Sequence, residues 1–172
     1  MPRPATRWKP PACAQRGIYL ARQGKHQEAE AIVSAIRDEF GKQPNAEVTA
    51  WVSLVEALIR FYSHPGPKAL DRLRRAHALS RAMNHPVLVP LCAAWLAHIE
   101  FSANRMEPML PYAVQALQLA QPTHHAALAR VSLVVADALF RGALRSGQGL
   151  VRSGAPTRAG RGRRRHDQCD AA

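Results

Sequence analysis

The strongest constraint on the fold is a helical spacing of apolar residues, interrupted by short breaks, from residue 12 to residue 141. Apolar residues recur three and four positions apart, which places them on one face of a helix. Glycine, proline or asparagine separates the stretches, as is typical of helix ends. The sequence contains no Asn-Gly or Asp-Gly turn and no long run of alternating apolar and polar residues, so no strand is expected. The chain is therefore predicted to be all-α, with about seven helices over residues 12–23, 26–40, 46–62, 67–83, 86–103, 108–120 and 123–140.

Taken in pairs, these segments contain an internal repeat. The second helix of each pair has an alanine, an apolar residue four positions later and another three positions after that, with starts 40 and 44 residues apart. The three copies are Ala29, Val33 and Ile36; Ala69, Leu73 and Ala76; and Ala113, Leu117 and Ala120. Over about residues 12–140 this pattern resembles the tetratricopeptide repeat, in which a small residue on the second helix lets the paired helices approach.

The resemblance implies an α-α superhelix of antiparallel helix hairpins, whose first helices line a concave groove that binds other proteins. The long period is similar to that of arrays attached to bacterial regulators. The resemblance implies that the chain is a non-catalytic scaffold that binds a protein or peptide partner. It also implies that the chain is a truncated fragment of a signalling or transcriptional regulator. From their positions on the first helices, Tyr19, Arg22, Glu56 and Arg60 are the expected contacts of the groove. The apolar helix 123–140 lacks a second helix to pair with, so its exposed face is expected to favour self-association.

Charge divides the chain into three parts. The net charge is +12, but residues 1–10 and 141–172 carry most of the excess, and the body between them is nearly balanced. Residues 1–11 contain four prolines and are expected to be a disordered basic leader. Residues 12–141 form the predicted helical domain, and residues 142–172 are expected to be a disordered tail rich in arginine and glycine.

Two interpretations of the tail stay open. A repeat array normally ends in a closing helix with a polar outer side. This tail contains six of the ten glycines and few large apolar residues, so it does not predict such a helix. Its composition is that of GC-rich codons read out of frame, which predicts a frameshifted end. Alternatively, the tail is genuine and makes the chain a small basic nucleic-acid-binding protein. Its contacts would then be Arg158, Arg161, Arg163, Arg164 and Arg165.

Other classes of function find no support in the sequence. The three cysteines are far apart, so neither a disulfide framework nor a zinc site is indicated, and a reducing, cytoplasmic setting is expected. No apolar run is long enough for a membrane span. His124 and His125 are adjacent and diverge on a helix, so no metal site is expected. No phosphate-binding loop, nucleophile elbow or zinc-protease motif is present, which predicts no catalytic residue and no cofactor.

Overall fold

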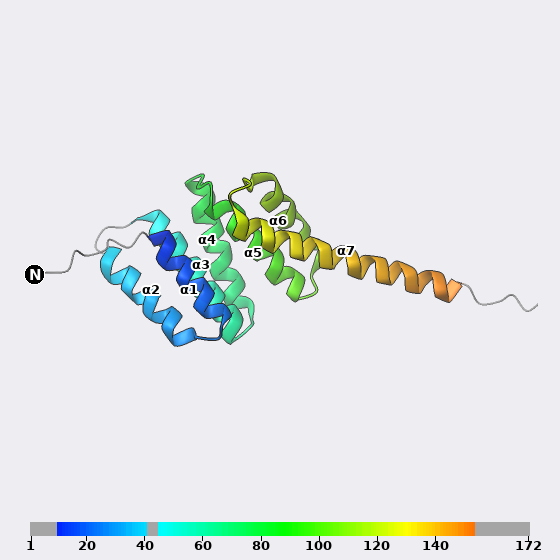
Figure 1. Cartoon of the computed structure of the whole chain (residues 1–172), viewed down its shortest axis with the longest axis horizontal. Helices are drawn as coiled ribbons and strands as arrows, with labels where there is room; N and C mark the ends of the chain where they lie inside the picture. The colour runs from blue at the N-terminus through cyan, green and yellow to red at the C-terminus, as the bar shows by residue number, and fades with distance from the viewer. Residues whose placement is uncertain (1–9, 41–44, 154–172) are drawn as a thin grey trace, which may run out of the picture. The chain divides into compact units, whose positions relative to one another are not determined.

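A computed structural model describes residues 10–40 and 45–153 of the chain (Figure 1). These residues form seven α-helices and no strand, which confirms the predicted all-α array of helix hairpins. The helices are α1 (Pro10–Arg22), α2 (His26–Phe40), α3 (Ala46–Ser63), α4 (Pro67–Ala82), α5 (Leu88–Ser102), α6 (Met106–Leu119) and α7 (His125–Ser153). In the described part, no helix is long and apolar enough to cross a membrane.

The chain divides into two compact units, residues 1–138 and residues 139–172. In the first, the hairpins α1–α2, α3–α4 and α5–α6 follow one another in chain order, and the first residues of α7 pack on the same core (Figure 1). In the second, the described residues continue α7 to Ser153. This helix therefore ends 13 residues beyond the predicted limit of Phe140 and includes the start of the expected tail. No proline lies between Thr123 and Ala155, so nothing removes a backbone donor from this stretch.

The first unit repeats with a constant period of 40 residues. Buried positions recur at this spacing on both the first and the second helices: Ala14, Leu54, Ala94 and Val134; Ala29, Ala69 and Met109; Val33, Leu73 and Ala113; and Ile36, Ala76 and Ala116. The predicted third copy, Ala113, Leu117 and Ala120, is thus one helical turn too late, and Leu117 is 46% exposed. The prediction was wrong because α6 begins at Met106 rather than Pro108, and a methionine takes the place of the small residue.

Small residues recur on the first helices where they cross their neighbours. Gly17, Ala57 and Ala97 share one repeat position and are all buried. At Gly17 a Cβ atom would lie 2.9 Å from Val55 Cγ1 of α3. A side chain at position 17 would therefore require Val55 or the two helices to shift.

Three helices end in the same way. Gly24, Asn84 and Asn104 have positive φ angles of 77°, 49° and 59° after α1, α4 and α5. The residue that follows each of them donates a backbone hydrogen bond to the carbonyl five positions earlier, for example Arg105 N to Glu100 O at 2.9 Å. This is the Schellman arrangement, which satisfies carbonyls that a helix end leaves free.

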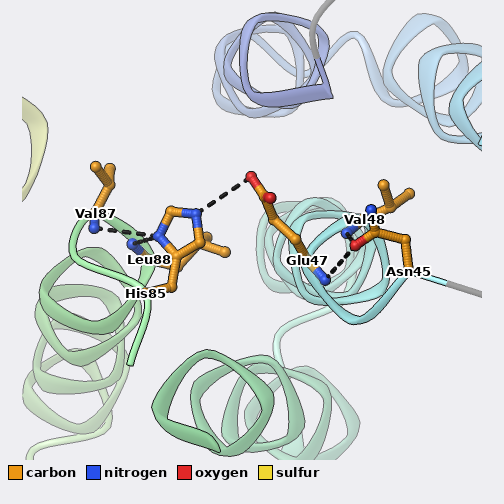
Figure 2. Close-up of polar contacts among 6 residues, drawn as sticks. All are labelled: Asn45, Glu47, Val48, His85, Val87 and Leu88. Atoms are coloured by element: carbon orange, nitrogen blue, oxygen red, sulfur yellow. Dashed lines mark hydrogen bonds and ion pairs between the residues drawn. The ribbon is translucent and has the colours of Figure 1, made fainter. Parts of the chain in front are cut away.

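His85 joins the second hairpin to the third, as Figure 2 shows. Its Nδ1 accepts hydrogen bonds from Val87 N at 3.2 Å and Leu88 N at 3.1 Å, which caps the start of α5. Because Nδ1 accepts these bonds, the ring proton lies on Nε2, which donates to Glu47 Oε1 at 3.2 Å. Asn45 caps α3 in the same view through its side-chain oxygen and Glu47 N, at 2.8 Å.

Candidate functional site

The first helices lie on the inner side of the array. The backbone of α1 contacts that of α3, and α3 also contacts α5, whereas α2 and α4 do not touch in the described residues. First helices that touch while second helices stand apart give a curved stack, with the first helices along its inner surface. A ligand bound on this inner surface would therefore meet α1, α3, α5 and the start of α7.

A cluster of aromatic rings crosses this inner surface from α3 to α5. Trp95 is its centre, with Tyr62 at 6.2 Å and His98 at 5.6 Å between ring centroids. Phe61 completes it, edge-on to Tyr62 at 5.1 Å and to His98 at 5.8 Å. Phe61, Tyr62 and His98 are half-buried and Trp95 is buried, so the rings form a fixed wall that retains some access to solvent. We call Phe61, Tyr62, Trp95, His98, Arg22 and Arg130 the aromatic–arginine surface.

Two arginines give this surface its charge. The Arg130 guanidinium lies over the Trp95 ring, 4.0 Å from its centroid, in a cation–π contact. Burial lowers the pKa of Arg130, Tyr62 beside it raises that pKa, and the charge of Arg22 lowers it again. Burial, with Arg130 and Arg22, lowers the pKa of His98 to about 4, so this ring is neutral at pH 7. Within the described residues, neither arginine forms an ion pair.

This arrangement offers groups that protein interfaces commonly use. Tryptophan, tyrosine and arginine are the residues that contribute most energy at protein interfaces. Two arginines without a carboxylate partner attract anionic groups, and an arginine fork matches a carboxylate in geometry. His98 is neutral at pH 7 and has no acidic neighbour among the causes of its pKa shift, so the charge of this surface comes from the two arginines.

A second, polar groove separates α2 from α4 on the outer side, with α3 as its floor. Glu56 of α3 spans it, accepting from Arg37 Nη2 of α2 at 2.6 Å and from Arg72 of α4. Cavities of about 840 Å³ and 730 Å³ lie on the two sides of this bridge and share these three residues. The bridge satisfies the Glu56 carboxylate and holds two second helices at a fixed distance.

Glu100 makes a comparable bridge further along the array. Its side chain is 1% exposed and accepts from Arg74 Nη2 of α4 at 3.3 Å and from Arg105 Nε, before α6, at 2.5 Å. A buried carboxylate needs such partners, because desolvation of an unpaired charge is costly. Glu100 therefore contributes to the joint between the second and third hairpins.

The structure separates the four residues predicted for the groove. Arg22 lies at the aromatic–arginine surface, within electrostatic reach of His98 and Arg130. Glu56 and Arg60 instead line the groove between α2 and α4. Tyr19 is 59% exposed on α1, at the repeat position that Ile59 and Ile99 bury in later hairpins. The five arginines predicted to bind nucleic acid, Arg158, Arg161, Arg163, Arg164 and Arg165, lie outside the described residues.

Of the aromatic–arginine surface, only Arg22 was predicted from the sequence as a binding residue. A signal was available: residues 61, 62, 95 and 98 are all aromatic or histidine, in a chain in which phenylalanine, tryptophan and tyrosine make up only 6% of residues. Their proximity depends on how hairpins stack, which the spacing within one helix does not determine.

Reactive groups elsewhere in the described part do not form a second site. No group of three or more histidine, cysteine, aspartate or glutamate residues there could hold a metal ion. Burial raises the pKa of the Cys92 thiol to about 12, so it packs as a small apolar residue. Burial also lowers the pKa of His77, whose ring packs against Tyr112 with centroids 5.9 Å apart.

Comparison with protein-family models, with curated proteins and with solved structures gives no match to this chain. The resemblance to tetratricopeptide repeats therefore remains a prediction from the sequence pattern, and the fold class rests on the structure alone.

Proposed function

We propose that this chain is a non-catalytic protein-interaction module that binds an acidic peptide segment of a partner protein. The observation that supports this most is the pair of arginines, Arg22 and Arg130, that flank a fixed aromatic cluster without an ion-pair partner in the described residues. Acidic side chains of a partner would supply the missing counter-charge. Its aromatic or aliphatic side chains would pack against Phe61 and Tyr62.

The wider setting follows from the resemblance and is part of the same proposal. A tetratricopeptide-like module of this length would serve as the docking segment of a larger bacterial signalling or transcriptional regulator, in the cytoplasm. A binding module of this kind requires no cofactor.

A selection of random twelve-residue peptides displayed on phage tests the proposal. Peptides that bind the full chain should be enriched in aspartate and glutamate, and their affinity should fall as salt rises. Synthetic versions of the enriched peptides should bind the double variant Arg22→Gln and Arg130→Gln at least about tenfold more weakly, because each lost charge-assisted hydrogen bond contributes about 1.5–3 kcal/mol.

Arg16→Gln is the matched control. Arg16 is an exposed arginine of the same helix as Arg22 and lies outside the aromatic–arginine surface, so its removal should leave affinity unchanged. Peptides without acidic residues, or equal binding to the double variant, would overturn the proposal. Capture of single-stranded nucleic acid in place of peptide, lost on removal of residues 154–172, would favour the basic-tail function instead.

A further inference from the structure

Arginines of the described residues share a carboxylate in pairs at two places. Glu56 accepts from Arg37 of α2 and from Arg72 of α4, so two arginines of different helices flank one acid. Glu100 is shared in the same way by an arginine of α4 and one before α6. The side chains of these four arginines are 41% to 58% exposed, so water screens the positive charge that each acid leaves uncompensated. An acid between two arginines is therefore a recurring arrangement in this chain.

A third pair of arginines, Arg22 of α1 and Arg130 of α7, has no such acid. Neither forms an ion pair within the part of the chain that the structure describes. Arg22 occupies the repeat position of Tyr62, on the helix that α1 contacts, and Tyr62 shares a hydrogen bond with Arg130. Both arginines also act on the ring of His98. The two guanidinium groups therefore approach the same region of the inner surface.

The charge of this third pair is less well solvated than that of the other two. Arg130 is half-buried, with its guanidinium 4.0 Å from the centroid of the Trp95 ring, and burial lowers its pKa. Water therefore screens its charge less than that of a more exposed arginine. The neighbouring His98 ring is neutral at pH 7 and compensates nothing. Two positive charges thus meet here with no carboxylate of the described residues paired to either.

A doubly charged anion fits this region better than a single carboxylate. A carboxylate carries one negative charge, so it would leave one of the two positive charges uncompensated. A phosphorylated side chain carries a charge of about −1.5 to −2 at pH 7 and has three strong acceptor oxygens. One phosphate can therefore bond to two arginine forks at once. Beside it, the half-buried rings of Phe61 and Tyr62 offer apolar surface to the residues that flank the phosphate.

We propose that the aromatic–arginine surface binds a phosphorylated side chain of the partner peptide, with the phosphate bridging Arg22 and Arg130. The phosphate takes the place that Glu56 and Glu100 hold between their own arginines. This assignment rests on the proposed function, because it names the acidic group that the peptide presents to this surface. Phosphorylation of the partner then creates the contact, and dephosphorylation releases it.

Three pools of short synthetic peptides test this on the full chain by fluorescence anisotropy. The pools have identical degenerate flanks without acidic residues and differ only at the central position, which is phosphoserine, glutamate or serine. We expect the phosphoserine pool to bind at least about tenfold more tightly than the glutamate pool, because phosphate adds a charge and an acceptor oxygen. The glutamate pool should in turn bind more tightly than the serine pool.

The variant Arg22→Gln separates this surface from the arginines of residues 154–172, which the variant retains. It should weaken binding of the phosphoserine pool at least about tenfold and that of the glutamate pool by about threefold or less, because one carboxylate can still pair with Arg130. Arg16→Gln, at an exposed arginine of the same helix, is the matched control and should change neither affinity. Arg22 is exposed at the end of α1, so circular dichroism of the variant should show unchanged helix content.

The outcomes distinguish this assignment from the proposed function. Equal affinity for the phosphoserine and glutamate pools, both above serine, would overturn the phosphate assignment and leave binding of acidic peptides standing. A preference for phosphoserine that Arg22→Gln leaves intact would also overturn it, because the phosphate would then bind elsewhere on the chain. Equal binding of all three pools would refute both this assignment and the proposed function.

Discussion

A methyl group at position 17 tests the close approach of α1 and α3 directly. In Gly17→Ala the new Cβ would lie 2.9 Å from Val55 Cγ1 and 3.7 Å from Ile32 Cγ2. The first distance is shorter than carbon atoms tolerate without a shift. Val55 is fully buried, and its β-branched side chain has one strongly preferred rotamer in a helix, so it cannot turn aside freely.

Two free-energy contributions of opposite sign determine the effect. Overpacking of a core costs about 1–3 kcal/mol. Alanine in place of glycine inside a helix stabilises by about 1 kcal/mol. Gly17→Ala should therefore lower the free energy of unfolding by about 1 kcal/mol. In a Val55→Ala background the clashing methyl group is absent, so the same substitution should stabilise by up to about 1 kcal/mol.

Urea unfolding followed by circular dichroism gives the four free energies of this double-mutant cycle. A change of 1 kcal/mol corresponds to about 2–4 °C in Tm for a chain of this size, so a thermal melt provides a second measurement. The reversal of sign is the critical observation. If Gly17→Ala changes stability by the same amount in both backgrounds, contact with Val55 is not the reason for glycine at this position.

Three further predictions concern single side chains. Glu100→Gln should lower the free energy of unfolding by about 1–3 kcal/mol, because it weakens two buried hydrogen bonds to arginines, whereas the exposed Glu28→Gln should change it little. The pKa of His98 is lower in the folded chain, about 4, than in the unfolded chain, about 6.5, so the unfolded state binds more protons between these values. Stability should thus fall as pH drops from 6.5 to 4, by clearly less than the full shift of about 3 kcal/mol, because water screens this half-buried ring. His98→Phe should reduce this dependence in urea titrations at each pH. His85→Ala should cost about 1 kcal/mol by uncapping α5, and His85→Asn, which keeps an acceptor near the two amides, should recover most of it in thermal melts.

Local signals were sufficient to predict the helices. Periodic apolar residues and proline or glycine breaks act within a few residues of each other, so α2, for example, has the predicted bounds 26–40. The prediction was wrong in α6, where Leu117 has the right chemistry and spacing but faces outward. From the sequence alone, Leu117 could not be distinguished from a core residue, because the repeat pattern contains no further hairpin that would cover it.

The candidate site was less predictable than the fold. Arg22 was placed on the inner surface from its position in the first helix, and the structure puts it beside His98 and Arg130. Glu56 and Arg60 belong to the same class of helix but point to the groove between α2 and α4. Which side of a first helix meets the inner surface depends on its rotation within the stack, and many weak contacts between hairpins set that rotation.

The joints between hairpins differ in the side-chain contacts that hold the second helices together. Between α2 and α4 the contact is an ionic tether through Glu56, beside two open cavities. Between α4 and α6 the rings of His77 and Tyr112 pack together, and Glu100 is out of reach of solvent. Ions screen the exposed arginines of this bridge more than they affect packed apolar side chains. Raising the salt concentration should therefore weaken the Glu56 bridge, while the close packing of Gly17 on Val55 continues to hold α1 against α3.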